Sequence, residues 1–318
     1  MHKLDVKDYK ILKELDKDYR KSFSEIAKTV GLSKNSIALR FEKLKEYIMH
    51  GAVGIDNELL GYKMVKVFYS FDYYDEKIEN QLIQELKKHK NILWVARFYG
   101  PFDISICLMV RDLNNLVTHI TQFNERFAKQ IREKEIQIVS KQFFCRHGYL
   151  YGETLPVNTK VFQTEKRYIL SDKEKKIFST FRNDPRMSII EISKKTNISP
   201  KTISVILKKL EKNKIITGYY MTLDNTKFNL NTFKILIQIY NTKHAKDFEE
   251  YLISLPNIRH FRKMLGLWDY EIDLVYPNMK ELHKQIDVIK QKFPGIFKKT
   301  SFVSFGERIV TNKESFLE

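Results

Sequence analysis

The chain has 318 residues, of which 43% are hydrophobic, so it is long enough to bury more than one core. Its 56 Lys and Arg outnumber its 39 Asp and Glu, and the resulting net charge of +17 favours a polyanion such as nucleic acid as partner. Two cysteines are too few for a disulfide framework or a thiolate metal site, and the charged start and the lack of a long apolar stretch argue against a secretory signal and a membrane span, so we expect a cytoplasmic protein without a metal.

Three short helices are expected within 1–55. Apolar side chains fall on one face of Lys7–Leu15, and Ser22–Val30 begins with a serine followed three residues later by a glutamate, which is the capping-box spacing. Gly31 permits a turn through positive φ, after which Ser33 can cap a third helix. This arrangement predicts a helix-turn-helix domain.

The third helix is the one that a helix-turn-helix lays in the major groove. The outward-facing residues near its start are Lys34, Asn35, Ser36 and Arg40. Asn and Arg side chains can read base edges, while Ser and Lys suit phosphate contacts, so double-stranded DNA is the predicted partner. The alternative is a generic tri-helical domain whose basic face is merely solvated.

A short extended link at 56–61 and an α/β unit are expected next, within 56–146. The unit reads strand, helix, strand, strand, helix, strand, which is the ferredoxin-like βαββαβ order. The predicted elements are Lys63–Phe71, Glu76–His89, Ile92–Tyr99, Asp103–Val110, Leu113–Phe127 and Glu135–Phe144. Its helices should cover one face of the sheet. By alternation, the residues expected on the other face, which needs a partner, include Val65, Val67, Tyr69, Ile104 and Ile106.

The whole plan is then repeated after a linker at 147–168, part of which is expected to pair as an extra strand or to pack across the sheets. Leu4, Ser33 and Gly100 find their counterparts 166 positions later. A second helix-turn-helix domain is expected at 169–222, where Asn197 forms the turn, and a second βαββαβ domain at 223–318, which begins with an extended link at 223–228. The elements of the latter are Thr232–Tyr240, Lys246–Ser254, Ile258–Leu265, Tyr270–Tyr276, Met279–Phe293 and Lys299–Gly306. The fold class is therefore α+β.

The two copies are expected to pair within the chain, because each sheet has an apolar face to cover and the linker keeps the partner close. Further homodimerisation is left open. Ser199 caps the second recognition helix, whose outward residues are Lys201, Thr202 and Ser204. Because the two recognition helices differ, a single chain should prefer an asymmetric site. Arg40 has no counterpart in the run Val205–Leu207, so whether the second helix-turn-helix contacts DNA or is purely structural also stays open.

Three stretches carry a family resemblance: FSEIAKTVGLS at 23–33, FYGPFDI at 98–104 and MLGLWDY at 264–270. In this order and repetition, the chain resembles the Lrp/AsnC (feast/famine) transcription regulators in a tandem form that covers nearly the whole length. The resemblance implies DNA binding by the helix-turn-helix, dimerisation through RAM- or ACT-like βαββαβ domains, and often an amino-acid effector near a Gly-x-x-Asp turn. The positions that match this turn are Gly100, Asp103, Gly266 and Asp269.

Other interpretations of the same residues remain. A glycine can serve a tight hairpin and an aspartate can bind its own backbone, so the Gly-x-x-Asp turns need no ligand. Siroheme decarboxylases share this architecture, but they carry an Arg-Glu-His-type signature where this chain has Ala96–Gly100 and Phe261–Gly266, and no carboxylate accompanies His260 in the sequence. We therefore expect no catalytic residues, no cofactor and no enzyme. A small-molecule sensor or interaction scaffold with vestigial DNA binding is the third alternative.

Overall fold

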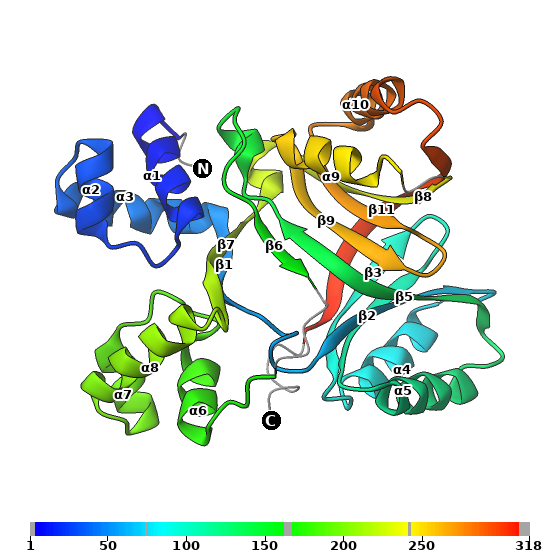
Figure 1. The fold of residues 1–318 in the computed structure, drawn as a ribbon, viewed down its shortest axis with the longest axis horizontal. Coiled ribbons are helices and arrows are strands. Elements are labelled where there is room, and N and C mark those ends of the chain that lie inside the picture. The colour runs from blue at the N-terminus through cyan, green and yellow to red at the C-terminus, as the bar shows by residue number, and fades with distance from the viewer. Residues whose placement is uncertain (1–3, 74, 162–166, 241–242, 312–318) are drawn as a thin grey trace.

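The computed structural model describes residues 4–73, 75–161, 167–240 and 243–311, so 162–166 of the predicted linker and both chain ends lie outside the described residues. Two small helical units lie on one side of the molecule, and a large β-structure with helices on its outside lies on the other (Figure 1). Within the described part of the chain, no helix combines the length and the apolar character that a membrane crossing needs.

The first helical unit has the predicted helix-turn-helix form. Ser22 and Glu25 make a capping box at the start of the second helix, and Gly31 ends that helix in the left-handed conformation with φ 70°. Buried Ile11, Ile26 and Ile37 join the three helices in one core. The helices are α1 (Val6–Lys17), α2 (Phe23–Val30) and α3 (Lys34–Leu44).

The second helical unit repeats this construction with different residues. Ser188 and Glu191 form its capping box, and Asn197 takes the left-handed conformation with φ 58° that Gly31 takes in the first unit. Pro200 occupies the first position of the third helix, where its missing N–H costs nothing. The helices are α6 (Asp172–Phe181), α7 (Ile189–Thr196) and α8 (Pro200–Lys212).

The expectation of extended links at 56–61 and 223–228 is wrong. The extended segments precede these positions: β1 (Ile48–Ile55) follows the 3-10 turn η1 (Lys45–Tyr47), and β7 is Ile216–Leu223. Residues 56–61 form a turn because the Asp56 carboxylate accepts backbone N–H groups at 3.0 and 3.1 Å, and the 3-10 helix η3 covers Asn225–Phe228. Strands β1 and β7 pair antiparallel with each other and so join the two helical units.

Both βαββαβ units have the predicted order of elements. The first contains β2 (Lys63–Phe71), α4 (Glu76–Leu86), β3 (Ile92–Tyr99), β4 (Ile104–Val110), α5 (Leu113–Arg126) and β5 (Ile131–Phe144). The second contains β8 (Asn231–Ile239), α9 (Ala245–Ser254), β9 (Ile258–Leu265), β10 (Tyr270–Tyr276), α10 (Met279–Lys292) and β11 (Phe297–Thr311). The last strand of each unit is longer than expected. The added residues 307–311 of β11 pair with β3 of the first unit, whereas the added residues 131–134 of β5 pair with β2 of their own unit.

The two sheets merge into one closed barrel instead of only packing face to face. Strand β5 pairs with β2 of its own unit through 131–138 and with β9 of the other unit through 138–144. Strand β11 does the same with β8 and β3, so that all strands of the nine-stranded sheet except β6 have a neighbour on both sides. Strand β6 (Asn158–Val161), in the predicted linker, adds to β5 as the expected extra strand, after the 3-10 turn η2 (Gly148–Leu150).

The predicted inner face of the sheet is wrong. The side chains expected to meet the partner sheet, Val65, Val67, Tyr69, Ile104 and Ile106, instead pack under helices α4 and α5. The barrel interior receives the alternate residues, among them Phe68 and Phe98 of the first unit and Leu236 of the second. Almost every residue of β2 is buried, so alternation defines two faces without showing which of them the helices cover.

A cluster of five charged side chains lies buried in the barrel. The Glu271 carboxylate, fully buried, accepts hydrogen bonds from Lys66, from Lys234 at 2.8 Å and from Arg262 at 2.7 Å. Lys234 also pairs with Asp273. Burial alone would raise the pKa of Glu271, but these three cations outweigh burial and lower it to about 2. Burial lowers the pKa of Lys66 to about 8. The nearby cations Lys234 and Arg262 lower it further, and the single carboxylate partner Glu271 compensates only in part.

We predict that Glu271→Gln destabilises the fold by about 3–5 kcal/mol, because it leaves three cations with the single carboxylate of Asp273. Lys66→Met should cost less, since Glu271 keeps two cationic partners. Because the folded pKa of Glu271 lies below its usual 4.5, the wild-type protein should lose stability as the pH falls from about 4.5 towards 2, and Glu271→Gln should weaken that loss. Urea denaturation at pH 7 and pH 3 measures both effects. Equal costs for the two variants would contradict this assignment.

Candidate nucleic-acid interface

Arginine side chains connect the two helix-turn-helix units, in addition to the pairing of strands β1 and β7. Arg186 of the second unit donates hydrogen bonds to the carbonyls of Tyr19 at 2.6 Å and Lys21 at 3.1 Å in the first. Its guanidinium lies 4.5 Å from the centre of the Phe23 ring. Arg20 of the first unit returns a hydrogen bond to a carbonyl of the second. The two recognition helices are therefore held in a definite relative position.

The start of α3 presents the residues predicted to meet DNA. The Ser33 hydroxyl caps the helix by accepting the backbone N–H of Ser36 at 3.1 Å, and the two hydroxyls lie 2.8 Å apart. Lys34 and Asn35 are exposed beside this cap, and the structure shows no hydrogen bond or ion pair of either side chain with a described residue. Both side chains are thus available to phosphates and bases.

The start of α8 has a similar cap. Ser199 accepts the backbone N–H of Thr202, and the hydroxyls of these two residues lie 2.8 Å apart. Lys201 is exposed next to them, while Ser204 is half-buried one turn further along the helix. The second unit therefore offers an exposed cation at the same end of its recognition helix.

Arg40 has a structural partner in addition to its predicted role at DNA. Its guanidinium donates to the carboxylates of Asp5 at 2.8 Å and of Asp8, which is buried, at 2.7 Å. These bonds raise the pKa of Arg40 and tie α3 to the start of α1. In the second unit, Lys209 and Glu174 make the corresponding connection at 3.0 Å. A base contact by Arg40 stays a prediction.

The aspartates of the two Gly-x-x-Asp turns bind the backbone of their own sheets. One carboxylate oxygen of Asp103 accepts the N–H of Phe71 at 2.7 Å, and one of Asp269 accepts the N–H of Ile239 at 2.8 Å. In each copy the bond joins the turn between the two middle strands to the end of the first strand. The aspartates thus have a structural role without a ligand.

The glycines of these turns lie where the two copies meet. Gly100 and Gly266 have φ of 133° and 152°, which side chains rarely adopt. A Cβ atom at Gly100 would lie 3.0 Å from the carbonyl oxygen of Phe302, and one at Gly266 would lie 2.7 Å from that of Ile136. Glycine is therefore needed because a strand of the other copy passes close by.

The residue before each aspartate points into the barrel. Phe102 and Trp268 are 3% and 2% exposed and belong to the inner apolar cluster. The Trp268 indole donates to Glu135 of the first copy at 2.7 Å. These two side chains fill space at the turns that a ligand would otherwise use.

Sequence reasoning missed the carboxylate partner of His260, because the partner comes from a neighbouring strand. Nδ1 of His260 lies 3.6 Å from the Asp273 carboxylate, and the two residues are paired in the register of β9 and β10. Burial, together with the charge of Arg259, lowers the pKa of His260 to about 3, so the imidazole is neutral. The register of the predicted hairpin could have found this pair, because counting outward from the Gly266–Asp269 turn places His260 opposite Asp273.

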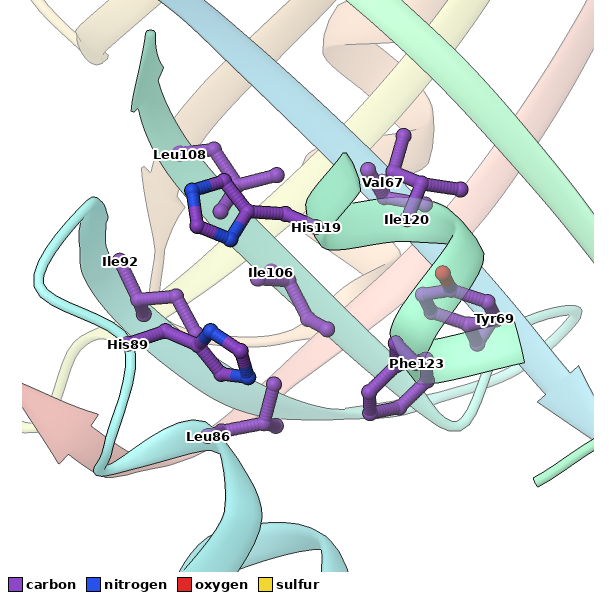
Figure 2. A pocket seen from close by; sticks show the side chains of 10 residues that line it. All are labelled: Val67, Tyr69, Leu86, His89, Ile92, Ile106, Leu108, His119, Ile120 and Phe123. Carbon is purple, nitrogen blue, oxygen red and sulfur yellow. The ribbon is translucent and has the colours of Figure 1, made fainter. Parts of the chain in front are cut away.

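A small cavity lies between helices α4 and α5 and the sheet of the first βαββαβ unit (Figure 2). It has about 300 Å³ of empty space, part of it open to solvent, and its lining is mostly aliphatic and aromatic. Two imidazoles, His89 and His119, meet edge to face with ring centres 5.3 Å apart, and Asn91 lies 2.7 Å from Nε2 of His119. The second unit has Leu255 and Gln285 at the positions of these histidines. The histidine pair is thus specific to the first unit, and the residues that line this cavity are not those of the Gly-x-x-Asp turns.

Family models match both helical units: an AsnC-type helix-turn-helix domain at residues 4–45 and a winged helix-turn-helix DNA-binding domain at 170–217. Among the described residues, no group of three or more His, Cys, Asp or Glu side chains could hold a metal ion. The matched residues include both capping boxes and both recognition helices described above.

Relatives match over a single copy of the repeat. The regulatory protein AsnC of Haemophilus influenzae is 31% identical over 118 residues, which is 36% of this chain and 78% of the relative. An uncharacterized HTH-type transcriptional regulator of Pyrococcus furiosus is 27% identical over 148 residues, which is 45% of this chain and 95% of the relative. The chain belongs to the Lrp/AsnC family of DNA-binding transcription regulators, as the sequence resemblance predicted.

Solved structures of a siroheme decarboxylase cover nearly the whole chain. The siroheme decarboxylase NirDL, in a complex with an iron-uroporphyrin III analogue, covers 98% of this chain and 95% of its own, with a TM-score of 0.66 and 14% identity. At this identity the likeness shows the fold alone. It confirms that two helix-turn-helix units and two βαββαβ units form one arrangement in a single chain.

We predict that Arg40→Ala destabilises the protein by about 1–3 kcal/mol, because the buried carboxylate of Asp8 loses its cation. Asn35→Ala is the matched control on the same helix and should leave stability unchanged, since Asn35 is exposed. Thermal unfolding of both variants without DNA measures the difference. Unchanged stability of Arg40→Ala would show that its ion pairs do not support the fold.

We also predict that Asp103→Ala and Asp269→Ala each cost about 1.5–3 kcal/mol in the absence of any ligand, because each removes a charged hydrogen-bond acceptor from a backbone N–H. The Asn variants keep an oxygen at this position and should cost less. Chemical denaturation of the four proteins gives the values. A full loss in the Asn variants as well would point to a role for the charge beyond this hydrogen bond.

Proposed function

We propose that the protein regulates transcription in the cytoplasm by inserting α3, and α8 with it, into the major groove of duplex DNA. The observation that carries the proposal is the pair of capped recognition helices, held by β1 and β7, with exposed Lys34, Asn35 and Lys201 at their starts. Ser36, Thr202 and Ser204 lie beside them and suit phosphate contacts. The membership in the Lrp/AsnC family supports the same function.

The single chain acts as its own dimer in this proposal. Family members of half this length match one copy of the repeat, and the two copies here share a barrel whose strands are paired on both sides. The two helix-turn-helix units therefore come from one polypeptide.

An amino-acid effector at Gly100, Asp103, Gly266 and Asp269 stays a prediction. The aspartates and the inward Phe102 and Trp268 already have structural partners, so an effector would have to bind on the outer side of these turns. A thermal-shift screen of amino acids at about 10 mM tests this prediction, because a ligand of the folded state raises the unfolding temperature. Without such a shift the protein is an effector-independent DNA binder.

We infer that the protein is not an enzyme. Its likeness to the siroheme decarboxylase concerns the fold, and the inside of the barrel is occupied by large side chains and by the charged cluster around Glu271. The His260 imidazole is held neutral beside Asp273 and Arg262 in that cluster. Visible absorbance after mixing with a tetrapyrrole separates the two functions, because a bound macrocycle is coloured.

We predict that DNA affinity falls steeply with salt, with log K decreasing by about 0.9 per phosphate contacted for each unit of log salt. Lys34→Ala should reduce that slope by about one contact and weaken binding to all sequences alike. Fluorescence anisotropy with a duplex at several salt concentrations measures the slope. Lys290→Ala, on the exposed side of α10, is the control for loss of charge alone. A flat titration would contradict DNA binding.

A further inference from the structure

A pseudo-twofold axis relates the two helix-turn-helix units, and the register of β1 and β7 defines it. Gly51 pairs with Met221, and Val53 pairs with Tyr219. A shift of 168 positions carries Gly51 to Tyr219 and Val53 to Met221, so each of these pairs is the image of the other. The axis passes between the two pairs. The recognition helices are therefore related as in a twofold DNA-binding dimer, although one chain supplies both.

The barrel follows the same kind of symmetry. Ile138 pairs with Leu265, and 166 positions later Ser304 pairs with Tyr99. Because each strand of the ring already has two neighbours, a second chain has no open position in the barrel. One chain therefore supplies both helix-turn-helix units and a closed barrel, which a symmetric dimer would build from two subunits.

The two recognition helices nevertheless carry different side chains at equivalent places. Counted from their capping serines, Ser33 and Ser199, the second helical residue is Asn35 in α3 and Lys201 in α8. Both are exposed, so both are available to the groove. A mutation can change one recognition helix without changing the other, which is impossible in a homodimer, where both helices have the same sequence.

These two side chains favour different bases. An Asn amide both donates and accepts, which matches N6 and N7 of adenine, whereas a Lys ammonium only donates, which matches O6 and N7 of guanine. We propose that one chain by itself occupies an operator of two unlike half-sites, in which Asn35 contacts adenine and Lys201 contacts guanine. This inference rests on the proposed DNA-binding function. Twofold-related recognition helices on one face of B-DNA are separated by one helical turn or a multiple of it, so the half-sites should lie a multiple of about 10 base pairs apart.

Selection of duplexes from a random pool with the full chain tests the proposal. The expected motif has no dyad symmetry and contains two half-sites, one with a required adenine and the other with a required guanine. Native mass spectrometry of the chain on the selected duplex should give one chain per duplex.

Exchange of the two readers makes the test specific. Asn35→Lys should change the preference of its half-site from adenine to guanine by at least about fivefold, and Lys201→Asn should do the reverse in the other half-site. Lys290→Asn removes the same charge as Lys201→Asn from an exposed position on α10, so it should leave the motif unchanged.

The inference would be overturned by identical inverted half-sites, by a single half-site, by two chains per duplex, or by base preferences that the exchanges do not alter. Salt-sensitive binding with no selected motif would also overturn it, while leaving DNA binding itself in place. Loss of binding to every duplex, by contrast, would contradict the proposed function. The two failures are therefore distinguishable.

Discussion

The exchange of the last strands between the two βαββαβ units is the constraint on which the rest of the structure depends. Strands β5 and β11 each begin in their own sheet and end in the other, so neither sheet is complete without the other copy. Closure of the ring gives every barrel strand two neighbours and removes the exposed edges that promote aggregation. Because both copies belong to one chain, this closure needs no second molecule and does not depend on protein concentration.

The interior of the barrel is less symmetric than its backbone. Lys66 and Lys234 occupy equivalent places in β2 and β8, but the carboxylates of Glu271 and Asp273 come from the second copy alone. At the equivalent positions the first copy has Ser105 and Cys107, both fully buried. Two first copies paired together would bury two lysines without a carboxylate, which is costly. The charges thus require the first copy to pair with the second.

The position of the first helix-turn-helix unit relative to the barrel also depends on a buried polar contact. Asp16 in α1 accepts the backbone N–H of His147 at 2.7 Å and contacts its Nδ1 at 2.8 Å, and Arg146 donates to the Asp16 carbonyl. His147 lies three residues beyond Phe144, the last residue of β5 that pairs with the second copy. The first helix-turn-helix unit is therefore attached to the segment that leaves the barrel, which gives a direct physical connection between the two parts of the molecule.

The sequence by itself determined the elements, because local signals define them: the capping boxes at Ser22 and Ser188, the left-handed turns at Gly31 and Asn197, and the repeat of the βαββαβ order. It also predicted outward positions for Lys34, Asn35 and Lys201, which are exposed, whereas the other side chains predicted to face outward are half-buried. Only the tertiary structure decided which face of each sheet the helices cover, that β1 pairs with β7, that β5 and β11 cross between copies, and that Arg40 binds Asp8. These outcomes depend on contacts between residues far apart in the chain, and a strand buried on both faces has no local pattern that shows which neighbour each face will meet.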